Sequence, residues 1–215
     1  IHDEKYPGFI HLDSFTSGMG NGCLQVTFGI ESFYEAIYCY DQLIPLMPIL
    51  IALTGSSSIV KGKLSGWDNR FNILNQLCDD RTDDEKDPSS KNYIYKSRYS
   101  NVYSYISDHN YIQDHHNNYP RMPIDNEFVL KMRNKGFPKR FSEFIAQLFV
   151  REPMIVFEKY VNIENKNDPS HFLNLMSTNW NSLRFKPPLE KDGDLNYKIE
   201  VRPCDLQFTS YENSS

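Results

Sequence analysis

Three segments of the sequence place charged or amide side chains at alternate positions. Gln25 stands between Leu24 and Val26, and residues 182–186 and 196–202 alternate in the same way. Because successive side chains of a strand point to opposite faces, this pattern predicts strands with one polar and one apolar face. The polar positions of the second and third segments are Arg184, Lys186, Lys198, Glu200 and Arg202.

The chemical types on this face indicate a binding site. Guanidinium, carboxylate and carboxamide groups together suit an anionic, metal-bound substrate. The alternative is an antiparallel sheet that simply exposes one face to water. In both interpretations Glu200 and Arg202 are neighbours, since residues two apart on a strand are separated by about 6.6–6.8 Å.

A glycine-rich loop, Gly18-Met19-Gly20-Asn21-Gly22, precedes the first of these strands. Glycines let a backbone approach a ligand closely or turn tightly into the next element, and both alternatives stay open here. The loop is not a P-loop, because no Gly-Lys-Ser/Thr follows it. It is not a dinucleotide fingerprint either, because a strand follows where that motif requires a helix.

Histidines and cysteines give weaker signals. His109, His115 and His116 lie in one Asn-rich stretch, which could form a metal site but is more typical of a polar surface segment. The four cysteines lie far apart and include no Cys-x-x-Cys pair: Cys23, Cys39, Cys78 and Cys204. A zinc site and a disulfide framework are therefore disfavoured, and a reduced intracellular compartment is favoured.

Helical spacing of apolar residues predicts a long helix over residues 33–53. The pattern Ser32-x-x-Glu35 is typical of a capping box at its start, and Pro45 and Pro48 should kink or break it. This helix should pack on the apolar face of the first strand.

Further elements follow from the same patterns. Amphipathic helices are expected over residues 125–135, ended by Gly136, and 142–151, ended by Pro153. Helices and strands without regular β-helix-β alternation predict an α+β fold with an antiparallel sheet. Extended segments are expected at residues 176–180, 182–186 and 196–202, and mobile polar loops at residues 79–92 and 107–123.

Composition excludes several classes of protein. The chain has 215 residues, of which 40% are hydrophobic and 24% charged, so a folded domain is expected rather than a disordered chain. The net charge is -5 and the basic residues form no stripe, which argues against nucleic-acid binding. The longest apolar run, Leu43–Leu53, has 11 residues, whereas a membrane span needs about 20. No membrane association is expected, and residues 1–7 are too polar for a signal peptide.

Seven motifs occur in the order and spacing of one known family. They are Gly18–Phe28, Cys78–Thr82, Lys96–Tyr99, Leu148–Pro153, Ser177–Trp180, Leu183–Pro188 and Glu200–Pro203. Over nearly its whole length the sequence resembles the catalytic subunit of eukaryotic glutamate–cysteine ligase. That family is far longer, so residues 1–215 are expected to be the central part of a single catalytic domain.

The resemblance implies a glutamine-synthetase-like fold, in which an antiparallel sheet forms a funnel-shaped active site flanked by helices. It implies ATP-dependent ligation of L-glutamate to L-cysteine through a γ-glutamyl phosphate, the first step of glutathione biosynthesis. Mg²⁺ is the implied cofactor and ATP the co-substrate, a regulatory (modifier) subunit is a further expected partner, and the expected location is cytoplasmic.

Site residues are carried over from the resemblance by position. Arg70 and Arg202 match arginines that meet glutamate or the transferred phosphoryl group, and Glu200 matches a residue near the metal. Gln25, Trp180 and Met19 match substrate- or nucleotide-binding positions. The alternatives are core packing for Trp180 and a surface salt bridge for Arg70.

Departures from the family pattern limit these expectations. Gly22 stands where some relatives have a second cysteine, Phe71 replaces a tryptophan, and Gln147 replaces a histidine. The family's magnesium-binding glutamates lie upstream of Ile1, so we expect the 215-residue chain alone to be inactive. The alternatives are a non-catalytic partner that retains the fold without those glutamates, and another carboxylate–amine ligase of the same fold.

Overall fold

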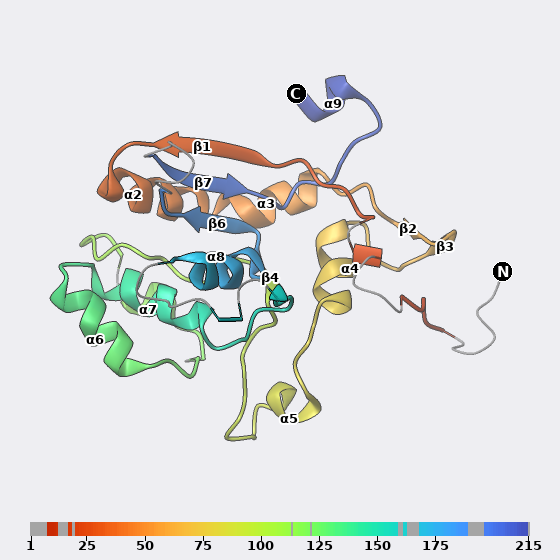
Figure 1. The fold of residues 1–215 in the computed structure, drawn as a ribbon. Helices are drawn as coiled ribbons and strands as arrows, with labels where there is room; N and C mark the ends of the chain where they lie inside the picture. The colour runs from red at the N-terminus through yellow and green to blue at the C-terminus, as the bar shows by residue number, and fades with distance from the viewer. Residues whose placement is uncertain are drawn as a thin grey trace.

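The computed structural model describes residues 8–12, 17–18, 20–112, 114–120, 122–158, 161–162, 168–188 and 196–214. Within these ranges helices and short sheets are mixed, as Figure 1 shows. The strands are β1 (Val26–Ile30), β2 (Ile59–Val60), β3 (Lys63–Leu64), β4 (Tyr99–Ser100), β5 (Trp180–Asn181), β6 (Leu183–Lys186) and β7 (Tyr197–Val201). The helices are α2 (Phe33–Leu43), α3 (Leu46–Leu53), α4 (Arg70–Leu77), α5 (Asp83–Lys86), η1 (Asp114–Asn117), α6 (Asn126–Asn134), α7 (Lys139–Leu148), α8 (Ser170–Ser177) and α9 (Ser210–Ser214).

The main sheet has three antiparallel strands in the order β1-β7-β6. Its register places Thr27, Glu200 and Arg184 side by side, and Phe28, Ile199 and Phe185 side by side. Alternation along each strand therefore gives the sheet one polar and one apolar face, as predicted. The prediction of an α+β fold with an antiparallel sheet is confirmed, whereas the funnel shape stays a prediction.

The apolar face of the sheet forms one side of the main hydrophobic core. Ile199 and Leu183 are completely buried there, as is Tyr40 of α2, and Phe144 of α7 is buried in the same cluster. Helices α2 and α7 thus pack against the apolar side of the sheet, and the charged side chains of the strands lie on the opposite face. The apolar periodicity of these helices explains the arrangement, since each can bury one stripe only against another apolar surface.

The predicted long helix is divided into α2 and α3. They meet at Ile44 and Pro45 with a bend of 51°, because proline has no N–H to continue the helical hydrogen bonds. Pro48 falls in the first turn of α3, where a missing N–H costs nothing. Ser32 is the N-cap of α2, but its side chain makes no capping hydrogen bond, so the predicted capping box is absent.

Among the described residues, no single helix has both the length and the apolar composition of a membrane span, although α2 and α3 together pass that test despite their bend.

Other expectations are confirmed or corrected by the structure. The helix ended by Gly136 is α6, and Gly136 has the left-handed φ of 93° that favours glycine. Helix α7 begins at Lys139, earlier than predicted, because the carboxylate of Asp108 accepts hydrogen bonds from its first N–H groups. Segments 182–186 and 196–202 contain β6 and β7.

Two stretches were predicted wrongly in part. Residues 176–180 were expected to be extended, but α8 runs to Ser177 and only Trp180 starts a strand. The pattern of a short apolar run is compatible with a helix or a strand. Here the residues form a helix, which buries Leu175 and Met176. Residues 79–92 contain the one-turn helix α5, which a capping box between Thr82 and Glu85 stabilises.

Candidate active site

Glu200 lies at the centre of the polar face of the sheet, with Thr27 of β1 on one side and Arg184 of β6 on the other. Only 4% of its surface is exposed. Its Oε1 atom lies 2.6 Å from Nη1 of Arg202 and 3.5 Å from Nη1 of Arg184. Its Oε2 atom accepts a hydrogen bond from Nζ of Lys186. One buried carboxylate is therefore enclosed by three cations.

The electrostatics of this cluster favour anions. Burial raises the pKa of Glu200, but the hydrogen bonds from Lys186 and Arg202 and the charge of Arg184 outweigh burial and bring the pKa below its usual value. Burial lowers the pKa of Arg184, and the nearby charge of Arg202 adds to that effect. Three positive charges against one negative charge leave an excess of two. Such a surface is suited to phosphate and carboxylate groups.

Arg70, the first residue of α4, is only 3% exposed. Its Nη2 atom donates to the backbone oxygen of Arg202 at 3.2 Å, and its Nη1 atom lies 3.5 Å from the backbone oxygen of Asn21. The Nε atom is buried and has no hydrogen-bond partner in the described part of the chain. Arg70 is therefore not the surface salt bridge of the alternative interpretation, and it links the glycine loop to the end of β7.

Asp205 holds Arg70 in place, and sequence reasoning missed it. Its carboxylate accepts the backbone N–H of Arg70 at 3.1 and 3.0 Å and the backbone N–H of Ser56 at 3.1 Å. Asp205 is 1% exposed. The available signal was its place two residues after Pro203, directly behind the motif that contains Glu200.

Tyr99 is the second residue that sequence reasoning missed, although it ends the Lys96–Tyr99 motif. It is buried and pairs with Trp180 across β4 and β5. Burial raises the pKa of Tyr99, and the charges of Arg70 and Arg202 oppose that shift. Its hydroxyl group therefore lies near both arginines.

Trp180 is half-buried and packs against a second core cluster that includes Phe71, Leu74 and Tyr99. Its backbone N–H donates to the oxygen of Arg98 at 2.8 Å. The core-packing alternative thus describes these surroundings of Trp180, and its strand partner Tyr99 belongs to the same cluster.

Two predicted residues are not joined to Glu200 by the contacts described here. Gln25 is exposed, just before β1, and donates to Sγ of Cys23 at 3.1 Å. Three steps lead from Val26 to Cys23, whereas four lead from Val201 to Asp205 on the paired strand. The extra residue forms a β-bulge around Pro203, opposite Gln25. Met19 lies outside the described residues.

The residues near Glu200 do not by themselves form a metal site. In the described ranges no group of three or more His, Cys, Asp or Glu side chains could hold a metal ion. Both oxygens of Glu200 already face cations, so Mg²⁺ binding there needs further carboxylates.

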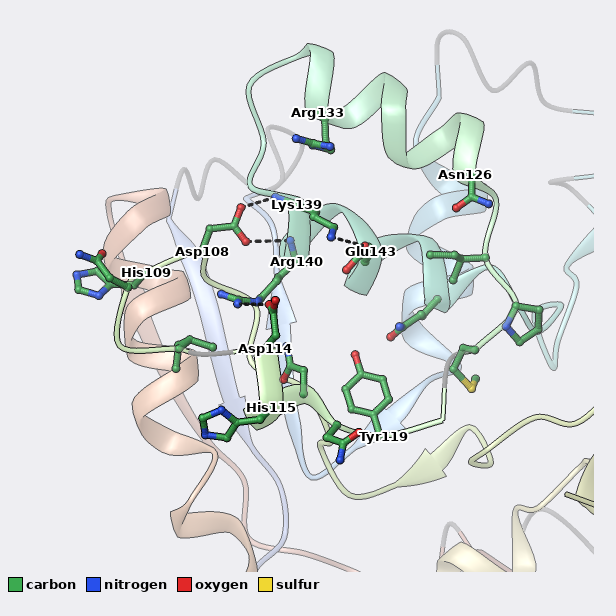
Figure 2. Close-up of a pocket in the computed structure, with 18 residues that line it drawn as sticks. Asp108, His109, Asp114, His115, Tyr119, Asn126, Arg133, Lys139, Arg140 and Glu143 are labelled. Carbon is green, nitrogen blue, oxygen red and sulfur yellow. Dashed lines mark hydrogen bonds and ion pairs between the residues drawn. The ribbon is translucent and has the colours of Figure 1, made fainter.

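A separate hollow of about 1360 Å³ lies between the segment 108–126 and helices α6 and α7. Figure 2 shows Arg140 directed at Asp114, 3.0 Å away, while His109 and His115 stand apart at its edge. The expected polar surface segment is thus present, and no metal cluster of described residues occurs in it.

Comparison with known proteins places the chain in one family. The family model described as "Glutamate-cysteine ligase" matches residues 2–215. The chain belongs to the glutamate–cysteine ligase family. It is 38% identical over 213 residues to the glutamate–cysteine ligase catalytic subunit of Homo sapiens, and this match covers 97% of the chain. The glutamate–cysteine ligases of Dictyostelium discoideum and Saccharomyces cerevisiae are 36% and 34% identical over 99% and 97% of the chain.

The chain spans about a third of the length of these relatives, with 33%, 34% and 35% covered in turn. The family resemblance inferred from the seven motifs is thereby confirmed. In this glutamate–cysteine ligase segment, the cationic face around Glu200 and the buried Arg70 are the features that best fit a site for anionic substrates.

Proposed function

We propose that this chain supplies part of the active site of an ATP-dependent glutamate–cysteine ligase, which makes γ-glutamylcysteine for glutathione biosynthesis. The observation that carries this proposal is the cluster of Arg184, Lys186 and Arg202 around the single carboxylate of Glu200, in a chain of the glutamate–cysteine ligase family. Such a surface can bind anions, and the proposed reaction needs no nucleophilic side chain of the protein.

The reaction joins two steps. An oxygen of the glutamate γ-carboxylate attacks the γ-phosphorus of ATP, the bond to the bridging oxygen breaks, and ADP leaves. The cysteine amine then attacks the acyl carbon, the carbon–oxygen bond to phosphate breaks, and the amine releases a proton to solvent. Both steps bring anions together, so positioning and charge neutralisation matter more than an acid–base pair.

The side chains of this face have distinct parts in that scheme. Arg202, whose side chain is 11% exposed, binds the glutamate carboxylate or the transferred phosphoryl group. Arg70 binds an anion through its Nε, which has no hydrogen-bond partner among the described residues, and fixes the backbone of Arg202. Lys186, the most exposed of the three cations around Glu200 at 34%, neutralises further negative charge.

Magnesium belongs to this proposal only in part. Mg²⁺ supplies charge neutralisation for the ATP phosphates, and its main ligands are proposed to be glutamates outside the described residues, with Glu200 beside them. Gln25, Trp180 and Met19 are proposed to contact substrate or nucleotide. A cytoplasmic location is proposed as well, and it is supported by four free cysteines. A modifier subunit stays a prediction.

The test uses the full-length protein that contains this chain. ADP release and γ-glutamylcysteine formation are measured together with glutamate, cysteine and ATP, and again with each substrate left out. We expect equal amounts of both products and no ADP release without glutamate. Ligation of a different amine in preference to cysteine would contradict the substrate assignment, and the absence of any ligation would favour the non-catalytic alternative.

A further inference from the structure

A small cavity lies between the β4–β5 pair and helix α7. Its volume is about 20 Å³, which exceeds the roughly 10–15 Å³ that one water-sized particle requires. Asn181 lines it, and Asn181 points to the opposite side of β5 from Trp180 because strand side chains alternate. None of its described lining residues belongs to the cluster around Glu200, so the two sites are separate. The charged side chains that line it are Lys96, Arg98 and Arg151.

Two of these three cations have carboxylate partners. Nη2 of Arg98 lies 2.7 Å from Oδ2 of Asp80, and Nη1 of Arg151 lies 3.0 Å from Oε1 of Glu85. Nη2 of Arg151 is also 3.3 Å from Oδ1 of Asp80. Two carboxylates thus balance two guanidinium groups, and the charge of Lys96 is left over.

Lys96 has only neutral partners among the residues that the structure describes. Its Nζ donates to Oδ1 of Asn181 at 2.7 Å and lies 3.8 Å from the centre of the Tyr103 ring. Burial lowers the pKa of Lys96 well below its usual value. The residue as a whole is half-buried, and an ammonium group that is partly withdrawn from water is stabilised by a nearby negative charge.

Unused hydrogen-bonding atoms belong to the same lining. Nε of Arg151 and Oε1 of Gln147 are buried without a hydrogen-bond partner in the described part of the chain. The amide of Gln147 can present either its oxygen or its NH₂ group by rotation. A single water could satisfy both atoms, but it would leave the charge of Lys96 unbalanced.

We propose that this cavity binds a small monovalent anion of the size of chloride. Nζ of Lys96, Nε of Arg151 and the amide NH₂ of Gln147 surround it, and the anion keeps Lys96 protonated. Because Lys96 also holds Asn181, the bound anion stabilises the strand that carries Trp180. A small inorganic anion is not a substrate of the ligation reaction, so the proposal of this site does not depend on the proposed function.

The first test is crystallographic and locates the anion. The full-length protein is crystallised in sodium bromide, and anomalous scattering is recorded at the bromine absorption edge. We expect a bromide peak within hydrogen-bond distance of Nζ of Lys96 and of Nε of Arg151. A water with no anomalous signal, or a carboxylate from outside residues 1–215 next to Nζ, would overturn the proposal.

The second test measures stability and needs no ligase activity. The Tm of the full-length protein is compared in chloride and in gluconate, which is too large for the cavity, at constant ionic strength. Chloride should raise the Tm of the wild type by about 2 °C or more. Lys96→Met should abolish that rise, and the control Lys91→Met, which alters an exposed lysine, should retain it. An equal chloride effect in Lys96→Met and the wild type would overturn the proposal, and the bromide peak decides the matter if Lys96→Met does not fold.

Discussion

Replacing Arg202 by alanine separates a substrate-binding role from a structural one. Nη1 of Arg202 lies 2.6 Å from Oε1 of Glu200, and a hydrogen bond between charged groups contributes about 1.5–3 kcal/mol to stability. Glu200 retains Lys186 and Arg184 after the change, so it is not left buried without a partner. We therefore expect a loss of stability near the lower limit, about 1.5 kcal/mol.

The kinetic effect should be larger than the effect on stability. If Arg202 contacts an anion whose charge develops during the reaction, Arg202→Ala in the full-length enzyme lowers kcat/KM by at least about a hundredfold, or 2.7 kcal/mol. Steady-state kinetics with glutamate varied measure this value, and circular dichroism with urea unfolding measures the fold and its stability.

Arg140→Ala is the matched control. Arg140 also pairs with a carboxylate, Asp114 at 3.0 Å, and its side chain is 16% exposed, close to the 11% of Arg202. It lines the hollow of Figure 2, and its helix α7 packs on the apolar face of the sheet, opposite the face of Glu200. Because the carboxylate of Asp114 is fully exposed and that of Glu200 is buried, Arg140→Ala should lose less stability than Arg202→Ala and should keep kcat/KM. Near-normal kinetics for a folded Arg202→Ala enzyme would refute the assignment of this sheet face to the active site.

Four further altered proteins have expected outcomes. Glu200→Gln leaves the surrounding cations without their carboxylate and should lower the free energy of unfolding by about 3–5 kcal/mol at pH 7. Because folding lowers the pKa of Glu200, the difference in free energy of unfolding between the wild type and Glu200→Gln, measured by urea unfolding, should shrink as the pH falls below about 4.5. The same variant should need more magnesium for half-maximal activity. Tyr99→Phe should lower kcat/KM about tenfold, since one hydroxyl near two arginines is lost, with little change in Tm. Cys23→Ser should keep most of the turnover, because amide formation through an acyl phosphate uses no thiol, and a loss above about a hundredfold would indicate a thiol role. Residues 1–215 alone should release no ADP in response to glutamate and cysteine, and robust ligation by them would contradict the expectation that the magnesium-binding glutamates lie elsewhere.

The sequence alone was enough for the polar face of the sheet. Period-two alternation depends only on strand geometry, so Lys198 and Glu200 had to share a face once their segment was a strand. The seven motifs were likewise readable without a structure, and the family match over residues 2–215 confirms them. Helix ends at Gly136 and the break at Pro45 follow from local backbone chemistry, which the sequence states directly.

Only the tertiary structure decided which distant residues meet. Arg70 and Asp205 are 135 positions apart, and no local pattern predicts that the carboxylate of Asp205 accepts the N–H of Arg70. The same holds for Tyr99, whose approach to Arg70 and Arg202 depends on the pairing of β4 with β5. The arrangement of charges on the polar face also depends on the tertiary structure. The sequence shows Lys186 and Glu200 only as separate charges, and the pairing of β6 with β7 places three cations around one carboxylate. Long-range packing fixes such contacts, and a strand or helix pattern carries no information about its partner.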